Sequence, residues 1–283
     1  MILKKSLLDS ITFVGMDREL CLGFYNTAPL WVNEQFGIEQ FEFPELLLTE
    51  FESETINERL RLGHQMEIVF EQLISFSEQW KILAKNLLID EGKIRLGELD
   101  FILRNIETAQ VYHIELAYKF YIVNPDISEP IHRLMGPNKR DMFFTKLDKL
   151  KEKQFPLLYN AALHDKLQEL EINPIIVIQQ ACFKTQLFVP YGDSNISIRP
   201  LNNKCIQGSW LRFNDFNSET FRKFEYYIPF KKEWVITPTS NRKYTSHYAA
   251  LLEVNLSMLK ENAPMLWVKK PDGTIEKLFV VWW

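Results

Sequence analysis

Two long strand-like runs in the first half of the chain constrain its fold most strongly. NLLIDEGKIRLGELDFILRN, at residues 86–105, places the turn signal Glu91-Gly92 between stretches of β character. After a short polar break, QVYHIELAYKFYIV at residues 110–123 continues in the same way. The sequence therefore predicts two or three adjacent antiparallel strands.

Length and composition set the class of protein. The chain has 283 residues, which suits one large domain or two modest ones with a real core. Hydrophobic residues make up 46% and charged residues 25%, which is typical of a folded globular protein and excludes general disorder. A net charge of −4 argues against a protein that coats nucleic acid with its whole surface. Any polyanion is expected to bind at a local basic patch.

The cysteines and the apolar runs bear on the cellular compartment. Cys21, Cys182 and Cys205 are far apart and form no CxxC pair, which predicts reduced structural thiols and neither a disulfide framework nor a zinc site. No run of about 18 apolar residues occurs, and the first ten residues lack a long apolar segment. We expect a cytoplasmic protein that has no membrane partner.

Helical periodicity surrounds the two strand-like runs. Residues 54–76 carry a stripe at spacings of three and four that includes Glu67, Phe70 and Ile74. After Pro137, a helix is predicted from the N-cap Asn138 to a point before Pro156, and another over roughly residues 157–170.

The segments past residue 172 are short, aromatic and β-branched, with one helix near residues 247–261. The predicted fold class is α/β. An N-terminal arm at 1–53 packs on a core at 54–172, a small mixed sheet flanked by helices, and a β-rich portion at 173–283 follows. That last portion is either a second domain or a continuation of the core sheet.

Acidic residues stand within the strand-like runs. Because successive strand side chains alternate in direction, Glu98 and Asp100 share one face, and His113, Glu115 and Lys119 share a face of the next strand. Pairing of the strands would place Asp100 and Glu115 within a few ångströms, where two carboxylates repel unless a proton or a cation lies between them. A hard divalent cation, Mg²⁺ or Mn²⁺, would be the usual occupant. The alternative is a solvent-facing strand with ordinary surface charges.

The predicted first helix supplies a third acid. Glu67 falls on the apolar stripe with Phe70 and Ile74, so it should point toward the sheet. An inward carboxylate costs several kcal/mol unless it is paired. The alternative is a helix glutamate that pairs locally with Arg61 or His64.

Several segments in order resemble a known group of proteins. A helix with an inward glutamate is followed by GELDF at 97–101, by an acidic strand that ends in lysine, and by a basic helix. This order resembles the PD-(D/E)XK nuclease-like superfamily. More narrowly, GELDFIL, IELAYKFYI, GPNKRD, QGSWLRF and EWVITP resemble one bacterial family that is catalogued only as a domain of unknown function. That family is assigned to the superfamily by remote similarity.

The resemblance implies a restriction-endonuclease-like mixed sheet flanked by helices. It matches Asp100 and Glu115 to the two metal-binding acids and Glu67 to the glutamate of the first helix, which would assist catalysis. The superfamily places its lysine two residues after the second acid, where this chain has Ala117. Lys119, on the same face about 7 Å farther along the strand, is the expected catalytic lysine.

Lysines of the basic helix are the expected contacts for nucleic-acid phosphates. Lys146 is also the alternative source of the catalytic ammonium, and Gln154, on the apolar stripe of the same helix, is a further candidate for the site. The ordinary alternative for this helix is a solvated face, because acidic residues dilute its charge. The predicted phosphate contacts are Lys139, Lys146, Lys149 and Lys153.

We therefore expect a Mg²⁺- or Mn²⁺-dependent nuclease that hydrolyses phosphodiester bonds of nucleic acid, with DNA favoured over RNA. One alternative is a catalytically inactive nuclease-like domain that binds nucleic acid or a protein, which the displaced lysine favours. Another is an assembly role for the aromatic C-terminal third. The chain has no G-x-S-x-G elbow and no glycine-rich phosphate loop.

Overall fold

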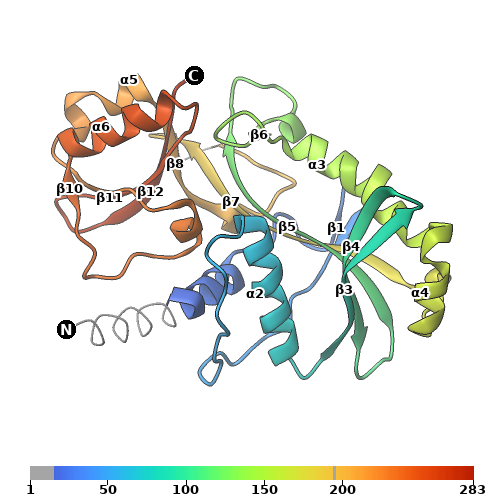
Figure 1. The fold of residues 1–283 in the computed structure, drawn as a ribbon. Coiled ribbons are helices and arrows are strands. Elements are labelled where there is room, and N and C mark those ends of the chain that lie inside the picture. The colour runs from blue at the N-terminus through green and yellow to red at the C-terminus, as the bar shows by residue number, and fades with distance from the viewer. Residues whose placement is uncertain (1–15, 194–195) are drawn as a thin grey trace. The chain divides into compact units, whose positions relative to one another are not determined.

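The structure is a computed structural model that describes residues 16–193 and 196–283 (Figure 1). Within those residues the fold is mixed α/β, with a mixed sheet of 12 strands accompanied by helices, which confirms the predicted class. The chain divides into two compact units. The first comprises Met1–Tyr118 and Leu147–Lys184, and the second comprises Lys119–Lys146 and Thr185–Trp283. The predicted division at residues 53 and 172 stays a prediction.

The first unit is built on the predicted strand pair. β3 (Trp80–Glu91) and β4 (Ile94–Asn105) form an antiparallel hairpin, and β5 (Val111–Val123) returns beside β4. Gly92, at φ +61°, supplies the left-handed residue that this hairpin turn requires. Both strand-like runs of the sequence are therefore confirmed as strands.

Shorter elements complete the sheet of the first unit. β1 (Glu34–Gln35) pairs with β2 (Ile38–Gln40), and β2 runs parallel to the start of β7 (Ile178–Pro190). The strand order is β7, β5, β4, β3. Residues 16–26 form a helix, so part of the predicted N-terminal arm is regular.

Helix α2 (Leu62–Phe76) covers one face of the hairpin but begins later than the predicted start at residue 54. The residues before it lie along the helix in a non-helical conformation. The Glu54 N–H donates to Gln72 Oε1 at 2.9 Å, and Gln72 Nε2 donates back to the Glu54 carbonyl. Because a helix side chain pairs with this backbone, the segment does not require helical hydrogen bonds. Phe70 packs on Phe101 of β4, with ring centroids 4.6 Å apart.

The opposite face of the hairpin is covered by short helical pieces. Neighbouring strand residues point to opposite faces, and Ile102, next to Phe101, packs with Leu158, Leu163 and Leu167. The pieces are a π-helical turn (Leu150–Gln154), 3₁₀ turns at Phe155–Tyr159 and Ala161–Leu163, and α4 (His164–Glu169). Helix α3 (Phe143–Lys149) precedes them in the chain.

The two helices predicted over this segment are therefore shorter and broken. Asn138 does not cap a helix, since its side-chain oxygen accepts from the Ala263 N–H at 2.7 Å. Asn160 interrupts the second predicted helix, because its side chain accepts from the Ala162 N–H and starts a new turn.

The second unit has a mixed set of strands, as the β-rich sequence predicts. β8 (Ile206–Arg212) and β12 (Ile275–Val281) are parallel, and β11 (Met265–Lys269) is antiparallel to β12. The remaining strands are β6 (Leu134–Met135), which pairs with the end of β5, β9 (Glu225–Tyr227) and β10 (Thr245–Ser246).

Helices α5 (Phe213–Phe216) and α6 (His247–Met258) cover one face of β11 and β12 (Figure 1). Phe216, Val254 and Leu266 belong to the apolar core between them. Single 3₁₀ turns lie at Pro130–His132, Pro174–Ile176, Asn203–Cys205, Glu219–Phe221 and Lys231–Val235.

The burial of the cysteines and the character of the helices bear on two expectations from the sequence. Cys21, Cys182 and Cys205 are all buried. Burial raises the pKa of Cys21 and of Cys182 to about 12, so neither thiol is reactive near neutral pH. Over residues 16–193 and 196–283, no helix combines the length and the apolar character that crossing a bilayer requires.

Gly208 generates a test of the second unit. It pairs with Lys277 across β8 and β12, and a Cβ on Gly208 would collide with the Lys277 carbonyl oxygen and lie 2.8 Å from its Cβ. Gly208→Ala should therefore lower the free energy of unfolding by about 1–3 kcal/mol, measured by chemical denaturation.

The matched control is Gly63→Ala in α2, where an added Cβ meets nothing within 4 Å. This variant should be neutral or up to about 1 kcal/mol more stable, because alanine favours helix. If Gly208→Ala and Gly63→Ala were equally stable, a steric clash at Gly208 would be contradicted.

Candidate functional site

Asp100 lies where β4 and β5 stop pairing. Within the described strands, their pairing ends at Phe101 and Ile114, and the next pair of this register is Asp100 with Glu115. The Asp100 side chain, 8% exposed, accepts a hydrogen bond from the Leu116 N–H at 2.8 Å. A side chain thus replaces the missing strand carbonyl, and the carboxyl group is held at the fork between the two strands.

Glu115 is fully buried on the neighbouring strand. Its Oε1 is 3.0 Å from His113 Nε2, and its Oε2 accepts from Gln154 Nε2. Both oxygens of the carboxyl group therefore face nitrogen atoms of neighbouring side chains.

The tautomer of His113 follows from its second neighbour. Gln179 Nε2 lies 2.9 Å from His113 Nδ1 and also donates to the Phe155 carbonyl at 2.8 Å. Because an amide nitrogen is a donor, Nδ1 must accept and the ring proton must be on Nε2, facing Glu115. Burial lowers the pKa of His113 to about 4, although the charge of Asp100 opposes this shift. Near neutral pH, His113 is therefore a neutral donor to Glu115.

The π-helical turn places Gln154 against Glu115. At the end of this turn the Phe155 N–H donates to the Leu150 carbonyl, five residues earlier. A π turn contains one residue more than an α turn, so it changes which side chains face the sheet. Gln154 is buried as a result, while Lys153 beside it is exposed.

Glu67 lies at the margin of the apolar stripe of α2. The stripe is formed by Met66, Val69, Phe70 and Leu73 with their neighbours, so its centre is offset from the one predicted. The Glu67 side chain is 21% exposed and accepts from Asn86 Nδ2 of β3 at 3.0 Å. Its Oε2 is also 3.4 Å from His64 Nδ1, which agrees with the local pairing considered as the alternative.

The structure thus brings together some of the predicted acids. Asp100 binds the Leu116 N–H next to Glu115, and His113 contacts Glu115 and is affected by the charge of Asp100. In the part of the chain that the structure describes, no three His, Cys, Asp or Glu side chains are grouped so that they could hold a metal ion. A hard cation that keeps several waters binds through one or two carboxylates, whereas zinc prefers nitrogen and sulfur ligands. The donor set therefore fits Mg²⁺ or Mn²⁺ better than zinc.

Lys119 begins the second unit and is engaged there. Its Nζ is 2.5 Å from Asp141 Oδ2. The pKa of Lys231 is lowered by burial and then by the charge of Lys119, while Asp141 opposes that effect. Lys119 therefore belongs to a cluster of two lysines and one aspartate.

The four basic residues proposed for phosphate contacts differ in their surroundings. Lys149 and Lys153 are exposed, near and within the π-helical turn. Lys146 is half-buried. Lys139 precedes α3 and lies over the Trp283 ring, 4.0 Å from its centroid, so it is not part of a basic helix face.

Comparison with known protein families gives a match over most of the chain. The sequence profile of a family described as a domain of unknown function (DUF1853) matches residues 37–281. The chain belongs to the DUF1853 family. No curated protein and no solved structure matches it.

Sequence reasoning missed two polar residues of this DUF1853 chain. Asn86 donates to Glu67 from a position with φ +48°, and nothing in its sequence context indicates that conformation. Gln179 orients His113 from the start of β7. His113 can be placed near Glu115 from the sequence, because residues two apart on a strand share one face.

The fork yields a stability prediction. Asp100→Ala leaves the buried Leu116 N–H without its acceptor and should cost about 1–3 kcal/mol in the free energy of unfolding. Asp100→Asn keeps an acceptor oxygen and should cost markedly less. Urea denaturation of both variants measures the difference, and equal losses would contradict the role given to this hydrogen bond.

Proposed function

We propose that this DUF1853 chain is a Mg²⁺- or Mn²⁺-dependent nuclease that hydrolyses phosphodiester bonds of nucleic acid, with DNA as the favoured substrate. The proposal includes a restriction-endonuclease-like core of the PD-(D/E)XK superfamily. The observation that carries it is a pair of buried acids where β4 and β5 separate, with Asp100 bound to the Leu116 N–H and Glu115 at the preceding residue of the same strand. Two carboxyl groups so placed favour a bound cation, because their charges repel each other.

Asp100 and Glu115 would hold the ion. When bound, a divalent cation stabilises the charge that develops on a phosphoryl oxygen and lowers the pKa of a bound water. The protein holds its two acids in fixed positions before any substrate arrives. The Leu116 N–H orients Asp100, while His113 and Gln154 orient Glu115. Preorganised ligands of this kind need little rearrangement when substrate binds.

The other predicted residues have supporting roles in this proposal. The proposed assistance by Glu67 would require its carboxylate to leave Asn86 and to act from α2, which packs on the Phe101 face of the hairpin. Lys149 and Lys153 would meet backbone phosphates, since both are exposed. The proposed role of Lys119 in orienting the attacking water would require its ammonium to leave Asp141.

A digestion assay tests the nuclease proposal. Purified protein with Mg²⁺ or Mn²⁺ should cleave plasmid or oligonucleotide DNA, and Asp100→Asn and Glu115→Gln should each reduce the rate roughly 100-fold or more. Glu152→Gln removes an exposed carboxylate from the π-helical turn and is the matched control, with unchanged activity expected. Thermal unfolding of each variant separates loss of chemistry from loss of fold. Cleavage that survives both site substitutions would rule out this site.

A second candidate function is a nuclease-like module that binds nucleic acid without cutting it. The observation that favours it is Ala117 at the position where the superfamily carries its lysine, together with the pairing of Lys119 with Asp141. Such a module does not require a cation at its two acids.

Calorimetry and DNA binding distinguish the two functions. A nuclease should bind Mn²⁺ in wild-type protein but not in Asp100→Asn. A binding module should retain salt-dependent DNA affinity in Asp100→Asn and lose it in a Lys149→Glu, Lys153→Glu double variant. DNA affinity that the double variant leaves unchanged would contradict the module and its basic face.

A further inference from the structure

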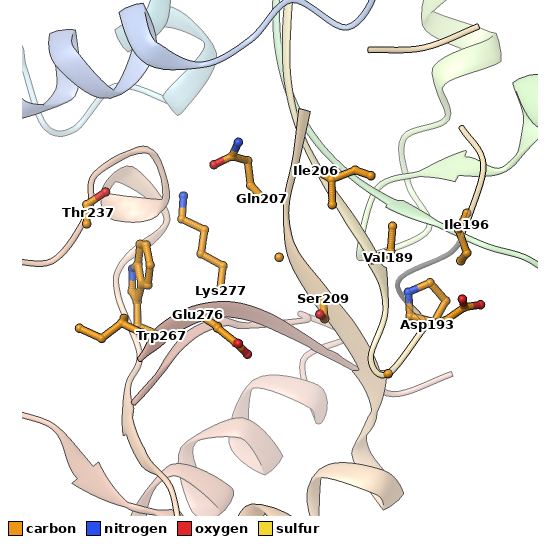
Figure 2. Close-up of a pocket in the computed structure, with 14 residues that line it drawn as sticks. Val189, Asp193, Ile196, Ile206, Gln207, Ser209, Thr237, Trp267, Glu276 and Lys277 are labelled. Carbon is orange, nitrogen blue, oxygen red and sulfur yellow. The ribbon is translucent and has the colours of Figure 1, made fainter. Parts of the chain in front are cut away.

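A pocket of about 810 Å³ lies in the second unit, at the beginning of the parallel strands β8 and β12 (Figure 2). Small-molecule sites commonly have volumes of about 300–1,000 Å³. Its apolar wall includes Val189, Ile206 and Trp267, and polar groups come from Gln207, Ser209 and Thr237. Gly208 lines it with bare backbone.

The side chain of Lys277 runs along this pocket. Figure 2 shows its amine pointing away from the carboxylate of Glu276, as expected for neighbouring residues of one strand. Lys277 is only 6% exposed, and its Nζ is 5.0 Å from the centroid of the Trp267 ring. A buried lysine in the wall of a pocket is a candidate for chemistry.

The amine of Lys277 has two hydrogen-bond acceptors of fixed direction. Nζ donates to Gln186 Oε1 at 2.6 Å and to the Trp234 carbonyl at 2.9 Å. A neutral amine has two N–H groups and one lone pair, so these acceptors occupy both of its donors. Its lone pair then projects away from them.

Burial lowers the pKa of Lys277 to about 7. The carboxylate of Glu276 is 2.5 Å from Lys270 and does not share the face of Lys277. Glu233, on the adjacent 3₁₀ turn, is engaged by Arg242. Just above neutral pH, most Lys277 side chains are therefore uncharged and nucleophilic.

We propose that Lys277 captures a small uncharged carbonyl compound, an aldehyde or ketone, as a reversible imine in this pocket. The nitrogen lone pair forms a bond to the carbonyl carbon, and the carbonyl π pair moves to oxygen. The nitrogen gives up its two protons, the oxygen takes up two, and the carbinolamine loses that oxygen as water when the C=N bond forms. One carbonyl compound and one amine thus give one imine and one water, with no change in oxidation state.

The pocket favours an uncharged ligand over an anion. The carboxylate of Asp193 is among its lining groups and would repel an anion, whereas that of Glu276 is paired with Lys270. The proposal does not depend on the nucleic-acid site, because every residue that it uses belongs to the second unit.

Reductive labelling tests the proposal. The full chain is incubated with benzaldehyde and cyanoborohydride at pH 7.5, and labelled lysines are quantified by peptide mass spectrometry. Lys277 should be labelled roughly tenfold faster than Lys270 despite its burial. Lys270 is the internal control, since its hydrogen bond to Glu276 raises its pKa. Labelling of Lys277 at the rate of Lys270, or more slowly, would overturn the proposal.

The pH dependence and one further variant locate the reaction. Labelling of Lys277 should rise between pH 6 and about 8 and then level off, because the amine loses its proton near pH 7. Labelling of Lys270 should continue to rise toward pH 10. Ser209→Trp fills the pocket and should slow labelling of Lys277 at least about fivefold while leaving Lys270 unchanged. Parallel pH profiles, or no effect of Ser209→Trp, would also overturn the assignment.

Discussion

When two strands of a sheet separate, the main-chain N–H groups along the opening must find other acceptors or carry an energetic penalty. At the fork between β4 and β5, the Asp100 carboxylate supplies that acceptor for Leu116. This hydrogen bond fixes the side chain at the sheet opening, close enough to His113 for its charge to affect the ring. The remaining polar groups of the cluster follow from it, because His113 and Glu115 come from the strand that Asp100 caps.

The strands and their polar face could be predicted from the sequence. Alternation of side chains in residues 86–123 predicts Asp100 and Glu115 on one face of paired strands, and β4 and β5 pair up to the residues next to them. The turn at Gly92 was equally readable, because few residues other than glycine accept its backbone conformation. The strict two-residue period of a strand is enough to predict which of its side chains share a face.

The helical contributions were less predictable, for specific reasons. Spacing from Phe70 and Ile74 predicts Glu67 on an inward stripe. The buried stripe also includes Met66, Val69 and Leu73, so its centre is shifted and Glu67 lies at its margin beside Asn86. Periodicity fixes the face of a helix only when the whole apolar set is considered. The pairing of Lys119 with Asp141 joins residues 22 positions apart, through contacts that sequence spacing does not specify.

The position of Gln154 has a different kind of consequence. Its contact with Glu115 depends on a turn that holds one residue more than a regular helix, so the contact is set by the number of residues in the chain. Substituting the exposed residues of that turn leaves its number of residues unchanged. Deleting one of these exposed residues would turn the Gln154 amide away from the sheet and remove a hydrogen-bond donor from Glu115. All the side chains of the cluster would still be present in the chain. The contact between Gln154 and Glu115 is therefore more sensitive to a change in chain length than to substitution of the exposed residues in this turn.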